Sequence, residues 1–406
     1  MNTIFSADYK TNKPHLVAPG EKIKNVAGII SSSVSEEVKL NGDKFANEIT
    51  QKFVADFEKT QNDFDLGKVN VVDKMVHVST FLVVDNTVYM TYYANTATAD
   101  EDPNHQIARL VYAPLSNVNE KTFLDVQSVG DTLSGLPVNL VYDTIMAKLD
   151  SENLIVLWTA KVGDNYYRLY RLFNTKTKTF GEIGVNRYKV KDITNDFSTT
   201  GIQNAMAENE IPYKRMFSDI GIMQKFTYRI ENGEKYYYTG TYSGDFTAII
   251  KSKDFITWEY VSQPDFLNES KWENATFVLN DKVYYFVRQQ DDVKYGFLTA
   301  YNLLNNCWEK PVIIEDCQSR GDFILYKNEL YLFHAPIDRE HIGIIKIDAE
   351  NLVNSKAIVQ AKMHTSCFYP FIQYLDNGEL AMSYTIERKH IRLARFTLSD
   401  YVDSEN

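Results

Sequence analysis

Carboxylates recur at the start of several strand-like segments, and this side-chain chemistry suits the hydrolysis of glycosidic bonds. Such hydrolysis uses two carboxyl groups. One is protonated and donates its proton to the leaving oxygen; the other is ionised and either attacks the sugar or activates a water molecule. Confinement near like charge raises one pKa and so separates the two roles. The candidate residues are Asp143, Asp219, Glu273 and Asp322. The sequence leaves open which two of them act together.

Arginine, histidine and tyrosine side chains lie near the same segment ends. A guanidinium group grips a carboxylate through two parallel hydrogen bonds, so the arginines predict a carboxylated sugar. For any of these ionised side chains the alternative is an ion pair that only holds the scaffold together. The substrate-binding candidates are Arg288, Arg320, Arg339, Arg388, His77, His334 and Tyr242, the last as a ring that stacks on sugar. The histidines lack the close spacing of metal ligands, so neither a metal nor a cofactor is predicted.

An internal repeat positions these side chains. Each unit reads as a polar residue, an apolar strand, a polar turn and a second strand rich in tyrosine, phenylalanine and β-branched residues. The six hairpins cover residues 76–93, 140–159, 217–242, 271–288, 318–343 and 366–385. A third strand and a short fourth follow most of them. Six such units in series predict an all-β fold, a six-bladed propeller of four-stranded antiparallel blades.

The propeller explains why distant residues would share one site. The innermost strand of each blade starts at one rim of the central channel, and the loop between the second and third strands returns to that rim. Strand starts and loops from all six blades therefore meet around one mouth. A concave mouth with several carboxylates and arginines is the default active-site candidate.

The first 70 residues do not follow the repeat. We expect an N-terminal extension over residues 1–70 and one propeller domain over 71–406. Apolar residues spaced as on one helix face predict an amphipathic helix at about residues 43–59. The last unit ends without a fourth strand. A strand from residues 24–31 or 68–72 is expected to complete that blade and remove its exposed edge.

Composition narrows the class of protein. The chain has 406 residues and a formal net charge of −11, which argues against nucleic acid as a partner because phosphates need a basic face. Three cysteines without close spacing indicate no disulfide framework. No signal peptide and no membrane-spanning apolar run is recognised. The chain is therefore expected to be cytoplasmic.

Two segments resemble the sialidase-like superfamily of propeller enzymes. The run Ser252-Lys253-Asp254-Phe255-Ile256-Thr257-Trp258 resembles the Asp-box turn, one residue short and without its Gly; this shorter form is also similar to the Ser-x-Asp turns of five-bladed furanosidase-type glycosidases. The last unit, from Phe368-Tyr369-Pro370 to Arg388-Lys389-His390-Ile391, resembles the closing blade of uncharacterised bacterial sialidase-like proteins.

The resemblance implies roles for particular residues. Sialidases use three arginines for the substrate carboxylate, a tyrosine nucleophile paired with a glutamate, and an aspartic acid. Arg288, Arg320 and Arg388 would be the arginines, and Tyr369 with Glu273 the nucleophilic pair. The chain has His77-Val78-Ser79 where an Arg-Ile-Pro-like motif would precede the first blade. This departure points away from sialic acid itself.

Three functions remain open at this point. The first is a glycoside hydrolase acting on short, possibly acidic, oligosaccharides through carboxylates at the channel mouth. The second is a polysaccharide lyase that uses histidine or tyrosine as base beside a uronate neutralised by arginine. The third is a propeller that binds carbohydrate or protein without catalysis, although the Gly-His and Trp-Asp marks of the commonest interaction propellers are missing.

Overall fold

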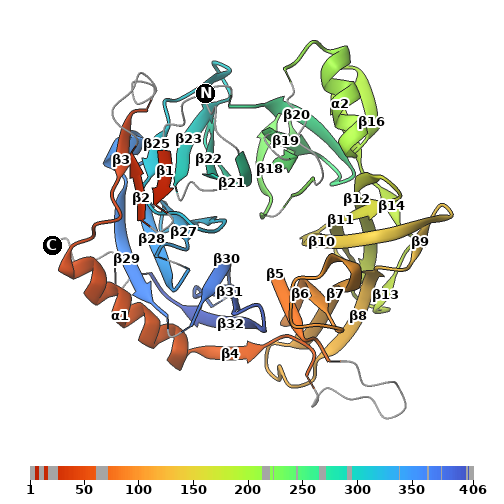
Figure 1. The fold of residues 1–406 in the computed structure, drawn as a ribbon, viewed down its shortest axis with the longest axis horizontal. Coiled ribbons are helices and arrows are strands. Elements are labelled where there is room, and N and C mark those ends of the chain that lie inside the picture. Colours follow the sequence, from red (N-terminus) through yellow and green to blue (C-terminus); the bar gives the residue numbers. More distant parts are fainter. Residues whose placement is uncertain are drawn as a thin grey trace.

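The fold is a ring of six β-sheets around a central axis, seen in a computed structural model (Figure 1). The model describes residues 26–60, 72–212, 220–222, 224–243, 246–264, 271–289, 295–337, 339–363, 365–375, 377–398 and 401, and the backbone of 5–8 and 13–16. The ring confirms the six-bladed β-propeller that the repeat predicts.

The first, fifth and sixth blades each have four antiparallel strands. The first contains β5 (Met75–Val84), β6 (Thr87–Asn95), β7 (Gln106–Pro114) and β8 (Thr122–Ser128). The fifth contains β26 (Asp322–Tyr326), β27 (Glu329–His334), β28 (His341–Ile347) and β29 (Lys356–Lys362). The sixth contains β30 (Cys367–Tyr374), β31 (Leu380–Ile386), β32 (His390–Phe396) and β4 (Phe53–Asp56).

The other three blades carry additional strands. The second contains β9 (Thr132–Leu133), β10 (Leu136–Lys148), β11 (Asn153–Val162), β12 (Asn165–Asn174), β13 (Thr179–Phe180) and β14 (Gly184–Val185). The third contains β15 (Arg187–Val190), β16 (Ile193–Asp196), β17 (Thr227–Glu231), β18 (Glu234–Ser243), β19 (Phe246–Ser252) and β20 (Thr257–Ser262). The fourth contains β21 (Lys271–Leu279), β22 (Lys282–Gln289), β23 (Gly296–Asn302), β24 (Cys307–Trp308), β25 (Val312–Ile314) and β3 (Gly28–Ile30).

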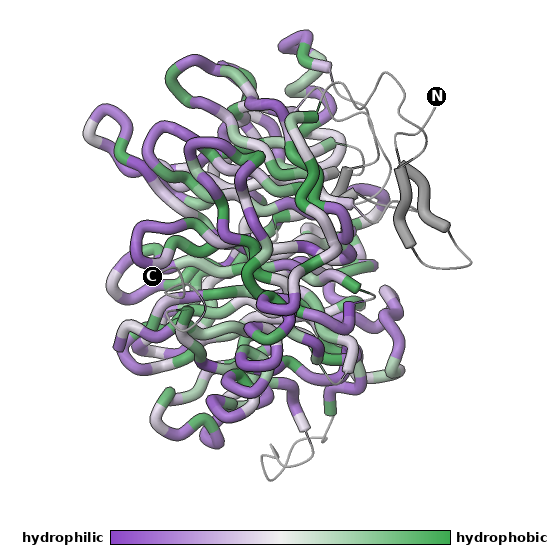
Figure 2. The backbone as a smooth tube through the Cα atoms, turned by 90° about the vertical axis from the view of Figure 1, so that its left-hand side faces the viewer, coloured by the Kyte–Doolittle hydropathy of each residue, from purple (hydrophilic) through white to green (hydrophobic). Residues whose placement is uncertain are grey.

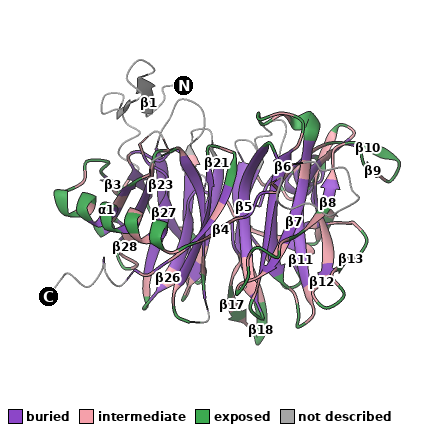
Figure 3. Cartoon of the chain, turned by 90° about the horizontal axis from the view of Figure 1, so that it is seen from below, coloured by how far each residue is buried: buried purple, intermediate pink, exposed green. Residues whose placement is uncertain are grey.

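The hairpin turns follow from their sequence. Asp85 and Asn86 have φ of 48° and 59°, and Lys327 and Asn328 have φ of 48° and 66°. Two consecutive left-handed residues form the tight turn whose twist matches that of antiparallel strands, and asparagine and aspartate tolerate that conformation best. Hydrophilic residues gather in the loops at the strand ends (Figure 2), while the strands between them are mostly buried (Figure 3).

Neighbouring blades are joined by apolar and aromatic side chains. Between the fifth and sixth blades, for example, the ring of Phe333 lies 5.6 Å from that of Phe396. The turn from Ser252 to Trp258 has a structural role: Asp254 Oδ1 accepts the N–H groups of Ile256 and Thr257, both at 2.8 Å. Trp258 is fully buried in a different apolar cluster, which joins the second and third blades.

The helix of the N-terminal extension is α1 (Glu36–Gln51), which begins earlier and ends earlier than residues 43–59. Ser35 caps it, and Phe45 and Ile49 are its buried apolar residues. Residues 53–56, which were expected to belong to the helix, instead form β4, and this strand pairs with the free edge of β32 (Figure 1). Unpaired backbone groups at that edge favour a strand there over another turn of helix.

The segments expected to close the ring lie elsewhere. Within residues 24–31, β3 pairs in parallel with β25 of the fourth blade. Of residues 68–72, all but the last lie outside the described residues. Two further elements are the hairpin β1 (Phe5–Asp8) and β2 (Lys13–Leu16), and the helix α2 (Thr199–Glu208). No helix in the described part of the chain has the length and hydropathy of a bilayer crossing.

Candidate active site

A cavity of about 350 Å³ opens where the first residues of the innermost strands meet. Most of the predicted site residues line it, although they come from all six blades. They are His77, Asp143, Tyr242, Glu273, Arg288, Arg339, Tyr369 and Arg388. The ring closure therefore gathers side chains that lie up to 311 residues apart, the separation between His77 and Arg388.

β-Bulges in the innermost strands present several of these residues. The pairing register shifts between His77 and Thr80 in β5, and between Phe368 and Phe371 in β30. A corresponding shift in β10 surrounds Asp143, which has φ of 50°, and Tyr369 in β30 has φ of 62°. Left-handed backbone is unfavourable for such residues and persists where the surrounding structure imposes it, commonly at functional sites. An extra residue in a strand re-aims the side chains beside it, here toward the cavity.

Glu273 is the centre of a buried hydrogen-bonded group. The Tyr369 hydroxyl donates a hydrogen bond to Glu273 Oε1, and Arg288 Nη1 donates to Glu273 Oε2 at 2.7 Å. Glu273 is 4% exposed and Tyr369 6%. The carboxylate therefore has one oxygen bonded to a phenol and the other to a guanidinium.

The surroundings keep Glu273 ionised and Tyr369 protonated. Burial alone would raise the pKa of Glu273, but the charge of Arg288 and the hydrogen bonds from Tyr369 and Arg288 together hold that pKa below its usual value. Burial, followed by the negative charge of Glu273, raises the pKa of the Tyr369 phenol. The pair is thus an ionised carboxylate that accepts a hydrogen bond from a protonated phenol.

His77 lies against the same tyrosine. Its ring centroid is 4.4 Å from that of Tyr369 and 5.0 Å from that of Phe368. Burial, then the positive charges of four arginines led by Arg388, lowers the pKa of His77 well below its usual value. His77 is therefore uncharged at pH 7 and lines the cavity without adding charge to it.

A second tyrosine–carboxylate pair lines the cavity. The Tyr242 hydroxyl donates to Asp143 Oδ2. Below it, the fully buried Arg168 donates from Nη1 to the backbone oxygen of Asp143 at 3.0 Å and to Thr159 Oγ1 at 2.8 Å. Arg168 comes from β12 and was not among the predicted site residues; its hydrogen bond to the backbone oxygen of Asp143 holds the bulge that carries this residue.

A third pair was missed by the sequence prediction. The Tyr93 hydroxyl donates to Glu101 Oε1, and Arg388 Nη2 lies 3.1 Å from Glu101 Oε2. Glu101 belongs to the loop between β6 and β7, which was expected to reach this rim. The acidic run Asp100-Glu101-Asp102 marked that loop, but only the fold selects Glu101 from it.

Four of the predicted residues, His334 among them, lie away from the cavity lining or outside the described chain. Arg320 is fully buried, with Cζ 5.0 Å from the centroid of the Tyr369 ring, and donates to Ser79 O at 3.4 Å. Asp322 is buried and ion-paired with Lys225 at 2.8 Å. Asp219 lies outside the described residues.

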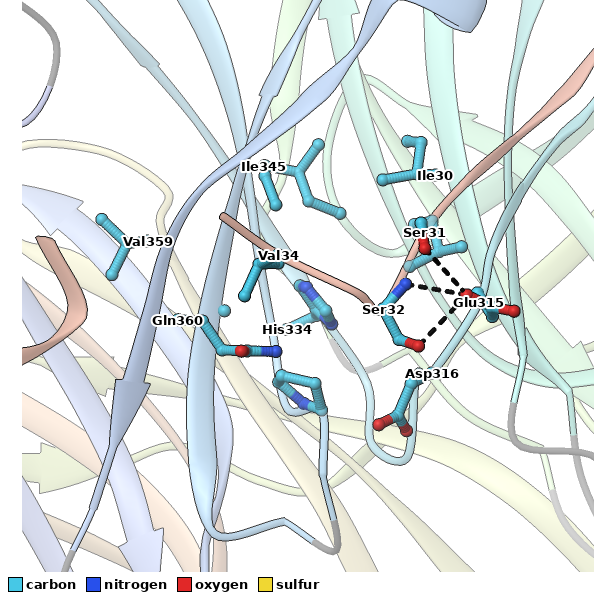
Figure 4. Close-up of a pocket in the computed structure, with 14 residues that line it drawn as sticks. Ile30, Ser31, Ser32, Val34, Glu315, Asp316, His334, Ile345, Val359 and Gln360 are labelled. Atoms are coloured by element: carbon cyan, nitrogen blue, oxygen red, sulfur yellow. Dashed lines mark hydrogen bonds between the residues drawn. The ribbon is translucent and has the colours of Figure 1, made fainter. Parts of the chain in front are cut away.

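His334 belongs to a separate small cavity of about 20 Å³ (Figure 4). There Glu315 Oε2 accepts hydrogen bonds from the Ser31 and Ser32 hydroxyls, both at 3.1 Å. Burial lowers the pKa of His334 to about 4. The space holds about one water molecule, so it is too small for a sugar.

One group of potential metal ligands occurs among the described residues, at the outer edge of the sixth blade. It consists of Asp56, Glu58 and His390. Arg392 already neutralises Asp56 through bonds of 2.8 and 3.0 Å, and His390 Nδ1 lies 2.8 Å from Glu58 Oε1. These contacts account for the cluster as a local ion-pair network.

Comparison with known proteins identifies the fold. No protein-family model matches the chain, and no curated protein matches its sequence. Among solved structures, Trypanosoma rangeli sialidase in complex with 2,3-difluorosialic acid has a TM-score of 0.54 at 13% identity, covering 84% of this chain and 59% of that one. A mutant of NanB sialidase from Streptococcus pneumoniae has a TM-score of 0.50 at 9% identity, covering 86% and 71%. A protein of unknown function from Dyadobacter fermentans has a TM-score of 0.53 at 12% identity, covering 79% and 94%.

The chain therefore has the sialidase-like propeller fold. It spans about 60% of the length of the Trypanosoma rangeli sialidases that it resembles. Identities this low show the fold alone, so the function has to be argued from the site.

Proposed function

We propose that this protein is a glycoside hydrolase that acts on short oligosaccharides containing a carboxylated sugar, with Tyr369 as nucleophile. The observation that carries the proposal is the hydrogen bond from the Tyr369 hydroxyl to Glu273 inside a cavity lined by arginines. The sialidase-like fold is in keeping with this chemistry.

The Tyr369–Glu273 pair would act as nucleophile and general base. As the Tyr369 oxygen attacks the anomeric carbon, its proton passes to Glu273 Oε1, and the bond to the leaving oxygen breaks. A neutral phenol suits a substrate that carries a carboxylate, because it adds no negative charge to the site before it reacts. Water then attacks the anomeric carbon and gives its proton to the carboxylate that had protonated the leaving oxygen. The sugar–tyrosine bond breaks and the proton on Glu273 returns to the phenol, so the anomeric configuration is retained.

The arginines would bind the carboxylate of the substrate. Arg339 donates Nε–H to Gln318 O at 2.9 Å, which leaves its two terminal nitrogens for a ligand. Arg288 and Arg388 approach from the neighbouring blades. Because His77 is neutral and stands where the family resemblance expects arginine, the first blade adds no charge, which favours carboxylated sugars other than sialic acid.

The leaving oxygen needs a proton donor, and Asp143 and Glu101 are the two further carboxyl groups of the cavity. An aryl leaving group with a low pKa departs without such help. The variant that loses turnover of an oligosaccharide but keeps turnover of an activated aryl glycoside identifies the donor. Asp143→Asn and Glu101→Gln are the matched pair for this comparison.

Covalent trapping tests the proposal directly. Fluorinated derivatives of sialic, glucuronic and galacturonic acids slow the second step of a retaining reaction more than the first. After incubation with the one that matches the accepted aryl glycoside, peptide mass spectrometry should place the sugar on Tyr369, and Tyr369→Phe should remain unlabelled. Label on another residue, or equal turnover by wild type and Tyr369→Phe, would overturn the mechanism.

A lyase is the less favoured reading of the same cavity. It needs a ready base, and burial and Glu273 raise the pKa of Tyr369 instead of lowering it. A lyase releases an unsaturated product that absorbs in the ultraviolet. An increase in ultraviolet absorbance when the protein is incubated with a polyuronate would therefore indicate a lyase.

A further inference from the structure

A buried lysine crosses the central channel below the cavity. Lys225 lies just before β17 in the third blade and is 7% exposed. Its Nζ is 2.8 Å from Asp322 Oδ2 in the fifth blade and donates to Phe323 O at 2.7 Å. It also donates to Ile372 O in the sixth blade. Since the third and sixth blades lie opposite each other in a ring of six (Figure 1), the side chain links opposite sides of the propeller.

The ion pair holds both backbone groups of one residue. Ile372 N donates to Asp322 Oδ2 at 2.8 Å, while Ile372 O accepts from Lys225 Nζ. β30 is the innermost strand of its blade, so its channel edge has no strand partner in the part of the chain that the structure describes. The two charged side chains supply the hydrogen bonds that a neighbouring strand would otherwise make.

The clamped residue lies next to the bulge that presents Tyr369. The register of β30 shifts between Phe368 and Phe371, and Ile372 is the second paired residue beyond that shift. Tyr369, inside the bulge, has φ of 62°. A backbone conformation of this kind needs to be imposed by fixed points on either side of it.

We propose that Lys225 and Asp322 are positioning residues, which hold β30 so that its bulge points the Tyr369 hydroxyl at Glu273. The catalytic importance of this positioning rests on the proposed function, in which Tyr369 is the reacting group. The position of the Tyr369 side chain does not depend on that function and can be measured without turnover.

The competing explanation is that the ion pair only stabilises the fold. Breaking any buried ion pair destabilises a protein, because one charge is left without its partner. Loss of stability therefore does not distinguish the two explanations, and the readout has to come from Tyr369 itself. The matched control is Arg109→Met, which breaks the buried pair between Arg109 and Asp73 (2.8 Å) in the first blade.

The test uses the full chain with a single 3-fluorotyrosine incorporated at position 369. Its ¹⁹F resonance is recorded in the otherwise unaltered protein and in Lys225→Met, Asp322→Asn and Arg109→Met. We expect the resonance to shift or broaden in the first two variants and to stay in place in the control. With the accepted aryl glycoside, and natural tyrosine at 369, those two variants should lose at least about 10-fold in kcat with KM changed by less than about 3-fold.

Two results would overturn the proposal: an unmoved resonance in folded Lys225→Met and Asp322→Asn, or an equal shift in Arg109→Met. Asp322→Asn retains a side-chain oxygen that accepts from Ile372 N, so it serves where Lys225→Met does not fold. If the unaltered enzyme turns over no carboxylated glycoside, the proposed function fails, while the ¹⁹F comparison still decides the role of the ion pair.

Discussion

Replacing Tyr369 by phenylalanine separates its chemical role from its structural one. The substitution removes one hydroxyl, which donates to Glu273 Oε1, and leaves the ring against His77. Tyr92→Phe is a matched control, because the Tyr92 hydroxyl is also buried and donates to a carboxylate, Asp73 Oδ2, at 2.8 Å.

The two substitutions should cost similar stability. A hydrogen bond to a charged group contributes about 1.5–3 kcal/mol to the free energy of unfolding. In both variants the carboxylate keeps another cationic partner, Arg288 for Glu273 and Arg109 for Asp73. Both melting temperatures should therefore fall by a few degrees, as differential scanning calorimetry can measure.

Their effects on turnover should differ widely. Loss of a nucleophile lowers kcat on the order of 10³-fold or more, leaving what binding alone provides. We expect this loss in Tyr369→Phe and less than about 2-fold change in Tyr92→Phe, measured with an activated aryl glycoside of a carboxylated sugar. Tyr369→Phe within 10-fold of wild type, or equal losses in the two variants, would refute the assignment of Tyr369.

Three further outcomes are expected. Arg339→Met should raise KM for a carboxylated substrate by about 10-fold or more and leave KM for its methyl ester unchanged, because a charge-assisted bidentate contact is lost; equal effects on both substrates would contradict a carboxylate site. The pKa of Glu273 is lowered in the folded chain, so its ionised form adds stability above the unfolded pKa of about 4.3, and this stability is lost as the pH falls through the lower folded value; urea unfolding from pH 7 to pH 3 should show a shallower loss for Glu273→Gln than for wild type. Ala55→Pro should lower the free energy of unfolding by about 1–3 kcal/mol, because proline cannot donate to the ladder between β4 and β32 and leaves a backbone carbonyl of β32 without its partner; a Tm for Ala55→Pro equal to that of wild type would show that β4 does not close the ring.

Local sequence accounts for the blades and only partly for the extension. Alternating apolar residues and turns such as Asp85-Asn86 specify hairpins wherever they occur, because the side-chain period and the turn geometry act within a few residues. The same local reasoning extended the helix over Phe53 to Asp56, since these residues continue its apolar face. Their pairing with β32 depends on an edge 336 residues away, the separation of Asp56 and Arg392, which no local pattern contains.

The candidate site divides in the same way. Residue types at the strand starts indicated carboxylates, arginines and Tyr369 around one mouth, because the repeat places equivalent positions at one rim. The sequence could not distinguish Glu273, which lines the cavity, from Asp322, which is ion-paired with Lys225 outside the cavity lining. Both are acids at the start of an innermost strand, and only the packing of the ring decides which one a substrate would meet.

The sequence by itself therefore determined the repeating unit, the number of blades and the rim at which ionisable groups collect. The tertiary structure alone decided which side chains touch: the bulges at Asp143 and Tyr369, the pairs with Tyr242 and Glu273, and the reach of Lys225 across the channel. The physical reason is that strand formation depends on neighbours along the chain. The direction of a side chain at a bulge depends on contacts made only after the ring has closed.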